Sequence, residues 1–211
     1  MRRPTARIAV IYYSATGTVH RLAQAFVDGA ADAGADVRLR RIAELAPDHA
    51  VEAQPRWREH LDATAHIPLA TLDDLRWADG FALGTPTRLG NVCAQVRQFL
   101  DTTSVPCQAD ELRGKPATGF TAGYEEHGGQ ETTLLSLYQT FHHWGSIILP
   151  TGYVNYDVSH AAGGNPHGVS EVESRAGRDP AYVKAVQEAA RHQGARLART
   201  AAALVAARAG L

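Results

Sequence analysis

A continuous apolar run over residues 8–13 opens the chain, and a small polar turn over residues 14–18 follows it. Apolar residues then recur at helical spacing over residues 19–30, and an alternating segment covers residues 37–40. A run that is apolar on both faces is typical of a central parallel strand with helices on both sides. This stretch therefore predicts a strand, a turn, a helix and a second strand, which form one right-handed crossover unit.

Three further apolar runs predict strands at residues 81–83, 116–121 and 147–149. Helical periodicity predicts helices over residues 92–100, 134–141 and 180–207, with a helical turn at 72–77. Two segments have no clear period. Residues 43–71 predict an irregular excursion, and the glycine-containing residues 153–179 predict a long loop with a functional or interfacial role.

Strands that alternate with helices along a chain predict a parallel sheet with helices on both faces. Five strands in this rhythm are typical of the flavodoxin-like α/β fold, a doubly wound five-stranded parallel sheet, here with enlarged loops. Ligands of such sheets bind beyond the carboxyl ends of the strands. The 211 residues show no internal repeat and no linker, so we expect a single domain over residues 1–211.

The composition disfavours several classes of function. Hydrophobic residues make up 45% of the chain and charged residues 20%, and the formal net charge is -1. Because no basic excess is present, we expect no nucleic-acid partner and no attraction to anionic membranes. No apolar stretch approaches the ~18 residues of a membrane span, and the N-terminus lacks a signal-peptide cleavage site. We therefore expect a soluble cytoplasmic protein.

Metal chemistry has no support in the sequence. Cys93 and Cys107 form no CxxC pair, and we expect two reduced thiols. His142 and His143 are adjacent in a helix and point about 100° apart, so they do not share a metal ion. No HExxH motif or Cys/His cluster occurs in the sequence. We expect no metal site, and each histidine alone favours a plain position on a helix face.

The turn after the first strand has the features of a phosphate site. Residues 14–18 open a helix, whose N-terminus exposes free N–H groups and a partial positive charge. Ser14, Thr16 and Thr18 add hydroxyl donors, so a phosphate fits without lysine or metal. The turn is neither a Walker A loop nor a GxGxxG dinucleotide motif. Taken alone, it is also typical of an ordinary helix N-cap.

Two more loops follow strands that end at the same edge of the predicted sheet. Residues 85–91 offer backbone N–H groups for the carbonyl edge of a flavin, and Arg88 for negative charge on its reduced ring. Residues 121–130 contain Gly123, Gly128 and Gly129, which permit close approach to a flat ligand. Alone, these loops favour an ordinary turn and a mobile surface loop. Three such loops at one edge favour a binding site.

Specific motifs connect the chain with a known family. They are YYSxxG at residues 12–17, GTPTRLGN at 84–91, FLD at 99–101, GGQET at 128–132 and GGNPHG at 163–168. Together they resemble the WrbA-type NAD(P)H:quinone oxidoreductases over nearly the whole chain. The succession of GTPTRxGN and GGQE is quite specific to that family.

The resemblance implies one FMN per subunit and a homotetramer. It places the FMN phosphate on the first loop, at Ser14, Ala15, Thr16, Gly17, Thr18 and Val19. It implies a ring pocket from the second loop, at Pro86, Thr87, Arg88, Leu89, Gly90 and Asn91. The third loop and one helix complete this pocket with Thr121, Ala122, Gly123, Tyr124, Gly128 and His143. Arg88 and His143 are the side chains expected to act in catalysis.

The implied activity is the two-electron reduction of a quinone by NADH or NADPH. The nicotinamide gives hydride to the flavin and leaves, and the quinone then takes the same place, so ping-pong kinetics are expected. Arg88 would stabilise negative charge on the reduced flavin. His143 would hydrogen-bond the flavin edge or an oxygen of the acceptor.

Three positions depart from the family pattern. Thr16 stands where the family often has an aromatic residue linked to nicotinamide binding. Cys107 matches a tryptophan that helps to sandwich the acceptor, and Trp144 replaces a second histidine. Three alternatives stay open: a flavodoxin-type electron carrier, a regulatory FMN-binding protein, and an FMN protein without turnover, which the replacements at Thr16 and Cys107 allow. The near-neutral charge disfavours a carrier, and the lack of a basic face or helix-turn-helix disfavours a regulator.

Overall fold

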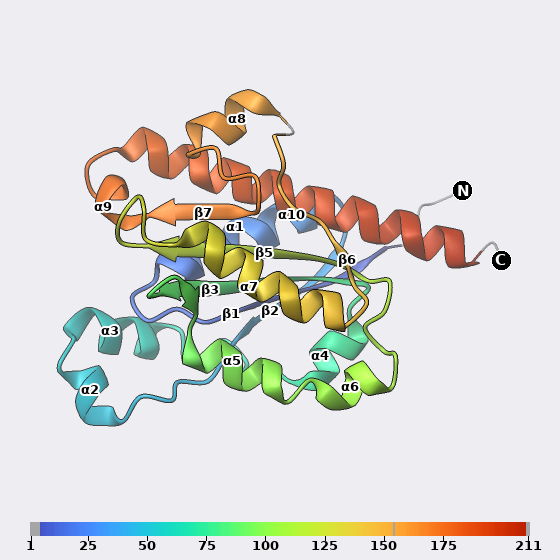
Figure 1. Ribbon diagram of the computed structural model, residues 1–211, viewed down its shortest axis with the longest axis horizontal. Helices are drawn as coiled ribbons and strands as arrows, with labels where there is room; N and C mark the ends of the chain where they lie inside the picture. The colour runs from blue at the N-terminus through green and yellow to red at the C-terminus, as the bar shows by residue number, and fades with distance from the viewer. Residues whose placement is uncertain (1–4, 154, 210–211) are drawn as a thin grey trace.

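The computed structural model describes residues 5–153 and 155–209 (Figure 1). Its parallel strands are β1 (Arg7–Tyr12), β2 (Asp36–Arg41), β3 (Gly80–Arg88), β5 (Pro116–Gly123), β6 (Ile147–Ile148) and β7 (Val169–Val172). They follow the order β2-β1-β3-β5, and both β6 and β7 pair with β5. This order is that of the flavodoxin-like α/β fold.

The prediction of five strands was wrong in number, because the described residues form seven. The edge position beside β5 is divided: β6 pairs with Pro116–Ala117, whereas β7 pairs with Phe120–Gly123. The described residues between these two pieces, 149–153 and 155–168, lie outside the sheet. The remaining strand, β4 (Asn91–Val92), pairs antiparallel with the end of β3 and closes a tight turn.

The two faces of β1 explain its unbroken apolar sequence. Ile8, Val10 and Tyr12 belong to one buried cluster, which includes residues of α1 (Thr18–Asp32) and α10 (Pro180–Ala209). Ala9 and Ile11 belong to a second cluster on the opposite face. The helices that contribute to it are α4 (Leu72–Trp77), α5 (Ala94–Asp101), α6 (Ser104–Gln108) and α7 (Gln130–His143). Helices on both faces were predicted, and Figure 1 shows the sheet between the two layers.

Two segments contain more regular structure than their sequences predict. The excursion at residues 43–71 contains α2 (Asp48–Glu52) and α3 (Pro55–Ala63), so the irregular prediction was wrong there. Pro55 stands at the start of α3, where proline is tolerated because the first N–H groups of a helix have no partner within it. The late segment at residues 153–179 contains α8 (Tyr156–Ala161), β7 and α9 (Glu173–Ala176). The helical turn at residues 72–77 was predicted with its correct bounds.

α1 and α10 cross in close contact, and each contributes a glycine to the crossing. A β-carbon on Gly29 would overlap the carbonyl of Arg191, and one on Gly194 would overlap the carbonyl of Phe26. The backbones therefore touch directly at this point. Although α10 has 30 residues, neither it nor another described helix is both long and apolar enough to cross a bilayer.

Candidate functional site

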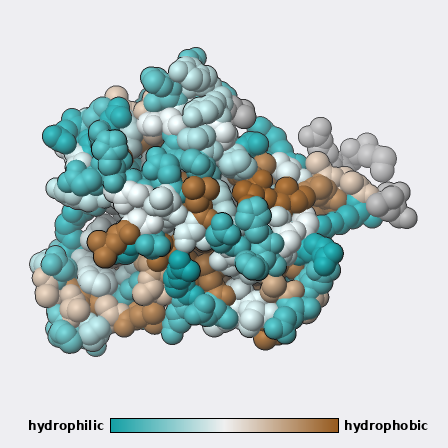
Figure 2. Space-filling view, in the orientation of Figure 1, coloured by the Kyte–Doolittle hydropathy of each residue, from teal (hydrophilic) through white to brown (hydrophobic). Residues whose placement is uncertain are grey.

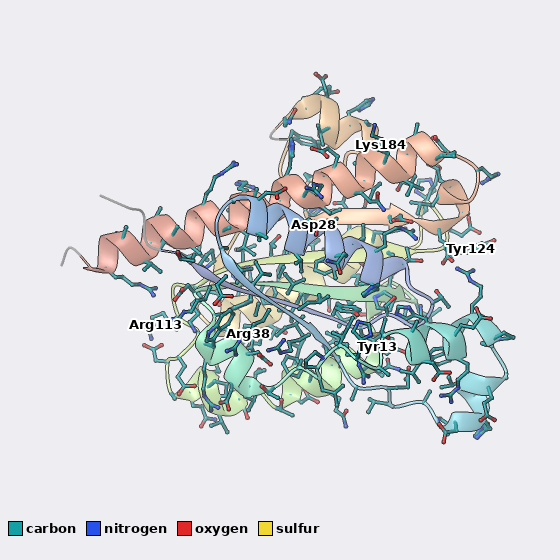
Figure 3. All side chains as sticks on the ribbon, turned by 180° about the vertical axis from the view of Figure 1, so that it is seen from behind. Tyr13, Asp28, Arg38, Arg113, Tyr124 and Lys184 are labelled. Atoms are coloured by element: carbon teal, nitrogen blue, oxygen red, sulfur yellow. The ribbon has the colours of Figure 1, made fainter. Side chains whose placement is uncertain are left out.

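The three predicted loops lie together at the carboxyl edge of the sheet. Since β1, β3 and β5 are parallel neighbours, the residues that follow them emerge on the same side. This side is at the left in Figure 1, where α1 and α7 begin. In Figure 3, the opposite view, Tyr13 and Tyr124 lie toward this end of the molecule and Arg113 toward the other.

The first loop presents an uncapped helix N-terminus. Gly17, the residue before α1, has φ +98°, and its N–H donates to Ser14 Oγ at 3.1 Å. The first hydrogen bond of the helix runs from the Arg21 N–H to the Gly17 carbonyl. No side chain caps the helix, and its first turn contains no acidic residue. Free N–H groups without a competing carboxylate suit an anion, so this loop fits the phosphate of FMN.

The second loop has buried side chains at its base and exposed side chains near its tip. Thr85 and Thr87 are buried at the end of β3, whereas Arg88 and Asn91 are exposed. Leu89 has φ +52° and a fully exposed side chain, and its carbonyl accepts from Asn91 Nδ2 at 3.1 Å. A leucine in the left-handed region, with no apolar neighbour to cover it, is a strained arrangement. An apolar surface of this kind suits the face of a flat ring.

Threonine hydroxyls join the second loop to the third. Thr87 Oγ1 donates to the Gly128 carbonyl at 3.2 Å and accepts from Thr133 Oγ1 at 2.7 Å. Thr132 Oγ1 donates to the Gly90 carbonyl at 2.9 Å. The third loop is therefore held against the second, and the interpretation of residues 121–130 as a mobile surface loop loses its basis.

Gln130, which was not among the predicted site residues, holds the backbone of the third loop in place. Its side chain is 2% exposed and donates from Nε2 to the Glu125 carbonyl at 2.7 Å. Its Oε1 is buried and has no partner among the described residues. A β-carbon on Gly123 would lie 2.7 Å from both Gln130 Nε2 and the Thr87 methyl group. Gly123 is thus required by packing, while Tyr124 beside it is 66% exposed.

The structure does not bring His143 to this edge within one chain. His143 ends α7, and a 14-residue helix is about 20 Å long. Gly145, just beyond it, packs against Arg113 at the opposite end of the molecule (Figure 3). Cys107 Sγ lies 3.4 Å from the His143 carbonyl, and Trp144 is buried and donates to Thr103 Oγ1 at 3.0 Å. Cys107 and Trp144, two of the three residues that differ from the family pattern, therefore lie with His143 at the end of the molecule opposite to the loops.

Two histidines that no sequence motif marked, one on α1 and one on the excursion, lie beside the first loop. His20 Nδ1 lies 2.6 Å from the Tyr12 hydroxyl oxygen, and the His20 and His60 rings are 5.4 Å apart. A β-carbon on Gly17 would be 3.4 Å from His60 Nδ1. Burial, and secondarily the proximity of His20, lowers the pKa of His60 to about 4. Only the helical structure of the excursion places His60 here, and the sequence pattern did not reveal that helix.

No group of three or more histidine, cysteine or acidic side chains within residues 5–153 and 155–209 is arranged to hold a metal ion. Both cysteines are free; Cys93 is buried and Cys107 is partly exposed. The residues at the edge instead suit a ligand with an anionic end and a flat apolar end. FMN has both parts.

Comparisons with known proteins agree with this geometry. The family model described as NADPH-dependent FMN reductase matches residues 6–161. A protein of Geotalea daltonii named NAD(P)H dehydrogenase (quinone) is 39% identical, over 96% of this chain and 100% of its own. One of the same name from Aromatoleum aromaticum is 38% identical, over 96% and 99%.

Solved structures show the same fold. A WrbA-like flavodoxin from Agrobacterium tumefaciens superposes with a TM-score of 0.63 at 22% identity, over 93% of this chain and 98% of that one. An NADH:FMN oxidoreductase in its apo form gives a TM-score of 0.56 at 18% identity, over 90% and 89%. The chain belongs to the NADPH-dependent FMN reductase family and, within it, to the WrbA-type NAD(P)H:quinone oxidoreductases.

Proposed function

We propose that this protein is an FMN-dependent NAD(P)H:quinone oxidoreductase that reduces quinones by two electrons. The observation that carries the proposal is the joint geometry of the carboxyl edge. An uncapped α1 N-terminus without acidic residues lies beside two loops that expose Leu89 and Tyr124. Family membership supports the same cofactor and the same reaction class.

The loops divide the task of holding FMN. The N–H groups at the start of α1, with Ser14 and Thr18 nearby, would hold the phosphate. Residues 86–91 and 121–128 would enclose the ring. The chemistry that FMN supplies when bound is acceptance of hydride from NAD(P)H and delivery of two electrons to a quinone.

Arg88 would act by electrostatics. Its side chain is exposed at the tip of the second loop, and its Nη1 donates to the Thr87 carbonyl at 3.3 Å. This bond keeps the guanidinium close to the loop that would hold the ring. A fixed positive charge there favours the reduced, more negative form of a bound flavin. No side chain needs to act as a general base, since hydride transfer does not require one.

We further propose a homotetramer that works in the cytoplasm. Since His143 lies at the far end of α7, it would act at a flavin only in a neighbouring copy's site. On the face covered by α5 and α7, apolar residues emerge among polar ones (Figure 2), and Leu135 of α7 is 46% exposed. Such a face could be covered by a second copy. Two free cysteines are compatible with a reducing compartment.

Initial rates test the shared-site mechanism. NADH and NADPH are each varied at several fixed concentrations of benzoquinone, with the FMN-loaded protein. Parallel double-reciprocal lines are expected, because the nicotinamide must leave before the quinone enters. Intersecting lines would contradict one shared site, and no turnover with either nucleotide would contradict the proposed reaction.

A further inference from the structure

A separate cavity of about 480 Å³ lies between α8, β7 and α10. None of the residues predicted for the flavin site lines it. The segment that encloses it is the one that leaves the sheet between β6 and β7. Figure 1 shows α8 above α10, on the side of the sheet away from α5.

One wall of the cavity is a basic stripe along α10. His192, Arg196 and Arg199 line it at spacings of four and three residues, which places them on one helix face. Arg196 is held in place, since it donates to the Pro150 carbonyl and lies 3.5 Å from Gln193 Oε1. Glu188 pairs with His192 at 3.0 Å but does not line the cavity. Arg199 makes no ion pair with a described residue.

The facing wall offers neutral polar groups and aliphatic surface. Ser159 and Asn155 come from α8 and its N-cap, and Ser170 comes from β7. Val158 and Ala162 supply apolar contacts from α8. No aspartate or glutamate is found among the described residues that line the cavity. The guanidinium groups of Arg196 and Arg199 have no carboxylate partner among the described residues, which favours an anionic ligand, and the aliphatic wall favours one with a hydrocarbon part.

We propose that this cavity is a second ligand site, distinct from the flavin site, that binds small organic carboxylates with a short aliphatic chain. The guanidinium groups of Arg196 and Arg199 bind the carboxylate, because the planar fork of arginine matches its two oxygens. The chain lies against Val158 and Ala162. A bound ligand thereby bridges α8 and α10 and stabilises the segment between β6 and β7.

Hexanoate is a suitable probe, with hexanamide as its uncharged counterpart and inorganic phosphate as an anion without a chain. Neither organic probe has an aromatic ring, so stacking on the flavin does not contribute to the measured affinity. Titration calorimetry of the FMN-loaded protein should show hexanoate binding at least tenfold tighter than hexanamide or phosphate. The flavin absorbance should stay unchanged. Hydrogen exchange should slow within residues 155–168.

Arg199→Gln is the main variant, because its exposed position makes a folding defect unexpected. It should weaken hexanoate binding about tenfold or more, the loss of one charge-assisted contact. Lys184→Gln, an exposed change on the same helix (Figure 3), should weaken it less than twofold. Ser159→Phe, which fills the cavity from α8, should abolish binding. The proposal is overturned if hexanoate does not bind, if hexanamide binds as well, or if Arg199→Gln has no effect. A ligand-induced change of the flavin spectrum would instead place hexanoate at the flavin.

Discussion

The hydroxyl of Tyr13 donates a 2.6 Å hydrogen bond to the carboxylate of Glu44. Tyr13 directly precedes the first loop, and Glu44 is the second residue of the excursion. The same carboxylate accepts from Trp57 Nε1 at 2.8 Å and from Gln95 Nε2 at 2.7 Å. It also accepts from the backbone N–H groups of residues 45 and 46. One side chain therefore joins the residue that follows β1, the excursion and α5 beside the candidate site.

Replacing this acceptor should destabilise the protein. Glu44→Gln keeps the shape but removes the charge, and its amide cannot accept as many bonds. We expect the free energy of unfolding to fall by about 1–2 kcal/mol, the range for losing charge-assisted hydrogen bonds at a partly buried site. Urea unfolding would measure it. Glu59→Gln, an exposed change on α3, is the control and should differ from wild type by less than about 0.5 kcal/mol.

The contribution of Glu44 should also depend on pH. Burial acts to raise the pKa of Glu44, but the hydrogen bonds from Tyr13, Ala46, Gln95 and Leu45 outweigh it and hold the pKa below its usual range. Because the folded pKa is the lower one, the stabilisation is present above the unfolded pKa and is lost as pH falls toward the folded pKa. The difference between wild type and Glu44→Gln should shrink on acidification from pH 6. A difference that stays constant down to pH 3 would show that the carboxylate charge has no part.

The burial of neutral His60 should make a second contribution to stability that is lost at acidic pH. Its folded pKa, about 4, lies below the usual value for histidine, so the unfolded chain takes up a proton first. Stability from neutral His60 is thus complete above about pH 6.5 and declines as pH falls toward 4. Between pH 7 and 5, His60→Gln should lose less stability than wild type. The exposed His49→Gln should follow wild type. Equal slopes for wild type and His60→Gln would refute the burial argument.

Where α1 and α10 cross, the positions of Gly29 and Gly194 have no room for a side chain. Gly194→Ala should lower the free energy of unfolding by about 2–3 kcal/mol or more, since the new methyl group overlaps backbone that only a helix shift could relieve. Thermal unfolding measures the loss. Gly177→Ala is the matched control, because its β-carbon would meet nothing nearer than 3.7 Å. If both variants melt together, the helices are not in direct backbone contact.

Arg88→Gln should slow flavin reduction by about 10- to 100-fold at saturating NAD(P)H. This is less than the roughly 100- to 1000-fold loss for a water-excluded donor to developing charge, because Arg88 is exposed. FMN affinity should change little, because the phosphate is held elsewhere. Stopped-flow absorbance gives the rate, and fluorescence titration gives the affinity. Arg97→Gln on α5, which removes only a contact with Ser136, serves as control. An unchanged rate of reduction would remove Arg88 from the proposed mechanism.

The sequence pattern predicted those elements in which the buried positions form a regular apolar pattern. The run at residues 8–13 is apolar on both sides because β1 contributes to both clusters, and a strand buried on both faces leaves a clear signal. The excursion gave no such signal, because α3 has no buried residue and therefore no apolar periodicity. The apolar run at residues 147–149 did predict β6, but β7 was missed, because it has only four residues and its position beside β5 depends on long-range pairing.

For the candidate site, too, some residue positions could be predicted from the sequence and others could not. Loops that follow neighbouring parallel strands must share one edge, so the positions of residues 14–19, 86–91 and 121–128 could be predicted. His60 could not, because its place depends on how the excursion folds back on Gly17. His143 was assigned from resemblance alone, and the length of α7 places it away from its own chain's loops.

The proposed oxidoreductase function is tested by FMN titration of the apoprotein, followed by anaerobic addition of NADH or NADPH while flavin absorbance is recorded. We expect stoichiometric binding, rapid bleaching of the flavin, and recovery of its absorbance when benzoquinone is added. Binding without bleaching would contradict the oxidoreductase function and leave a carrier or a silent FMN protein. Failure to bind FMN would contradict the assignment of the carboxyl edge itself.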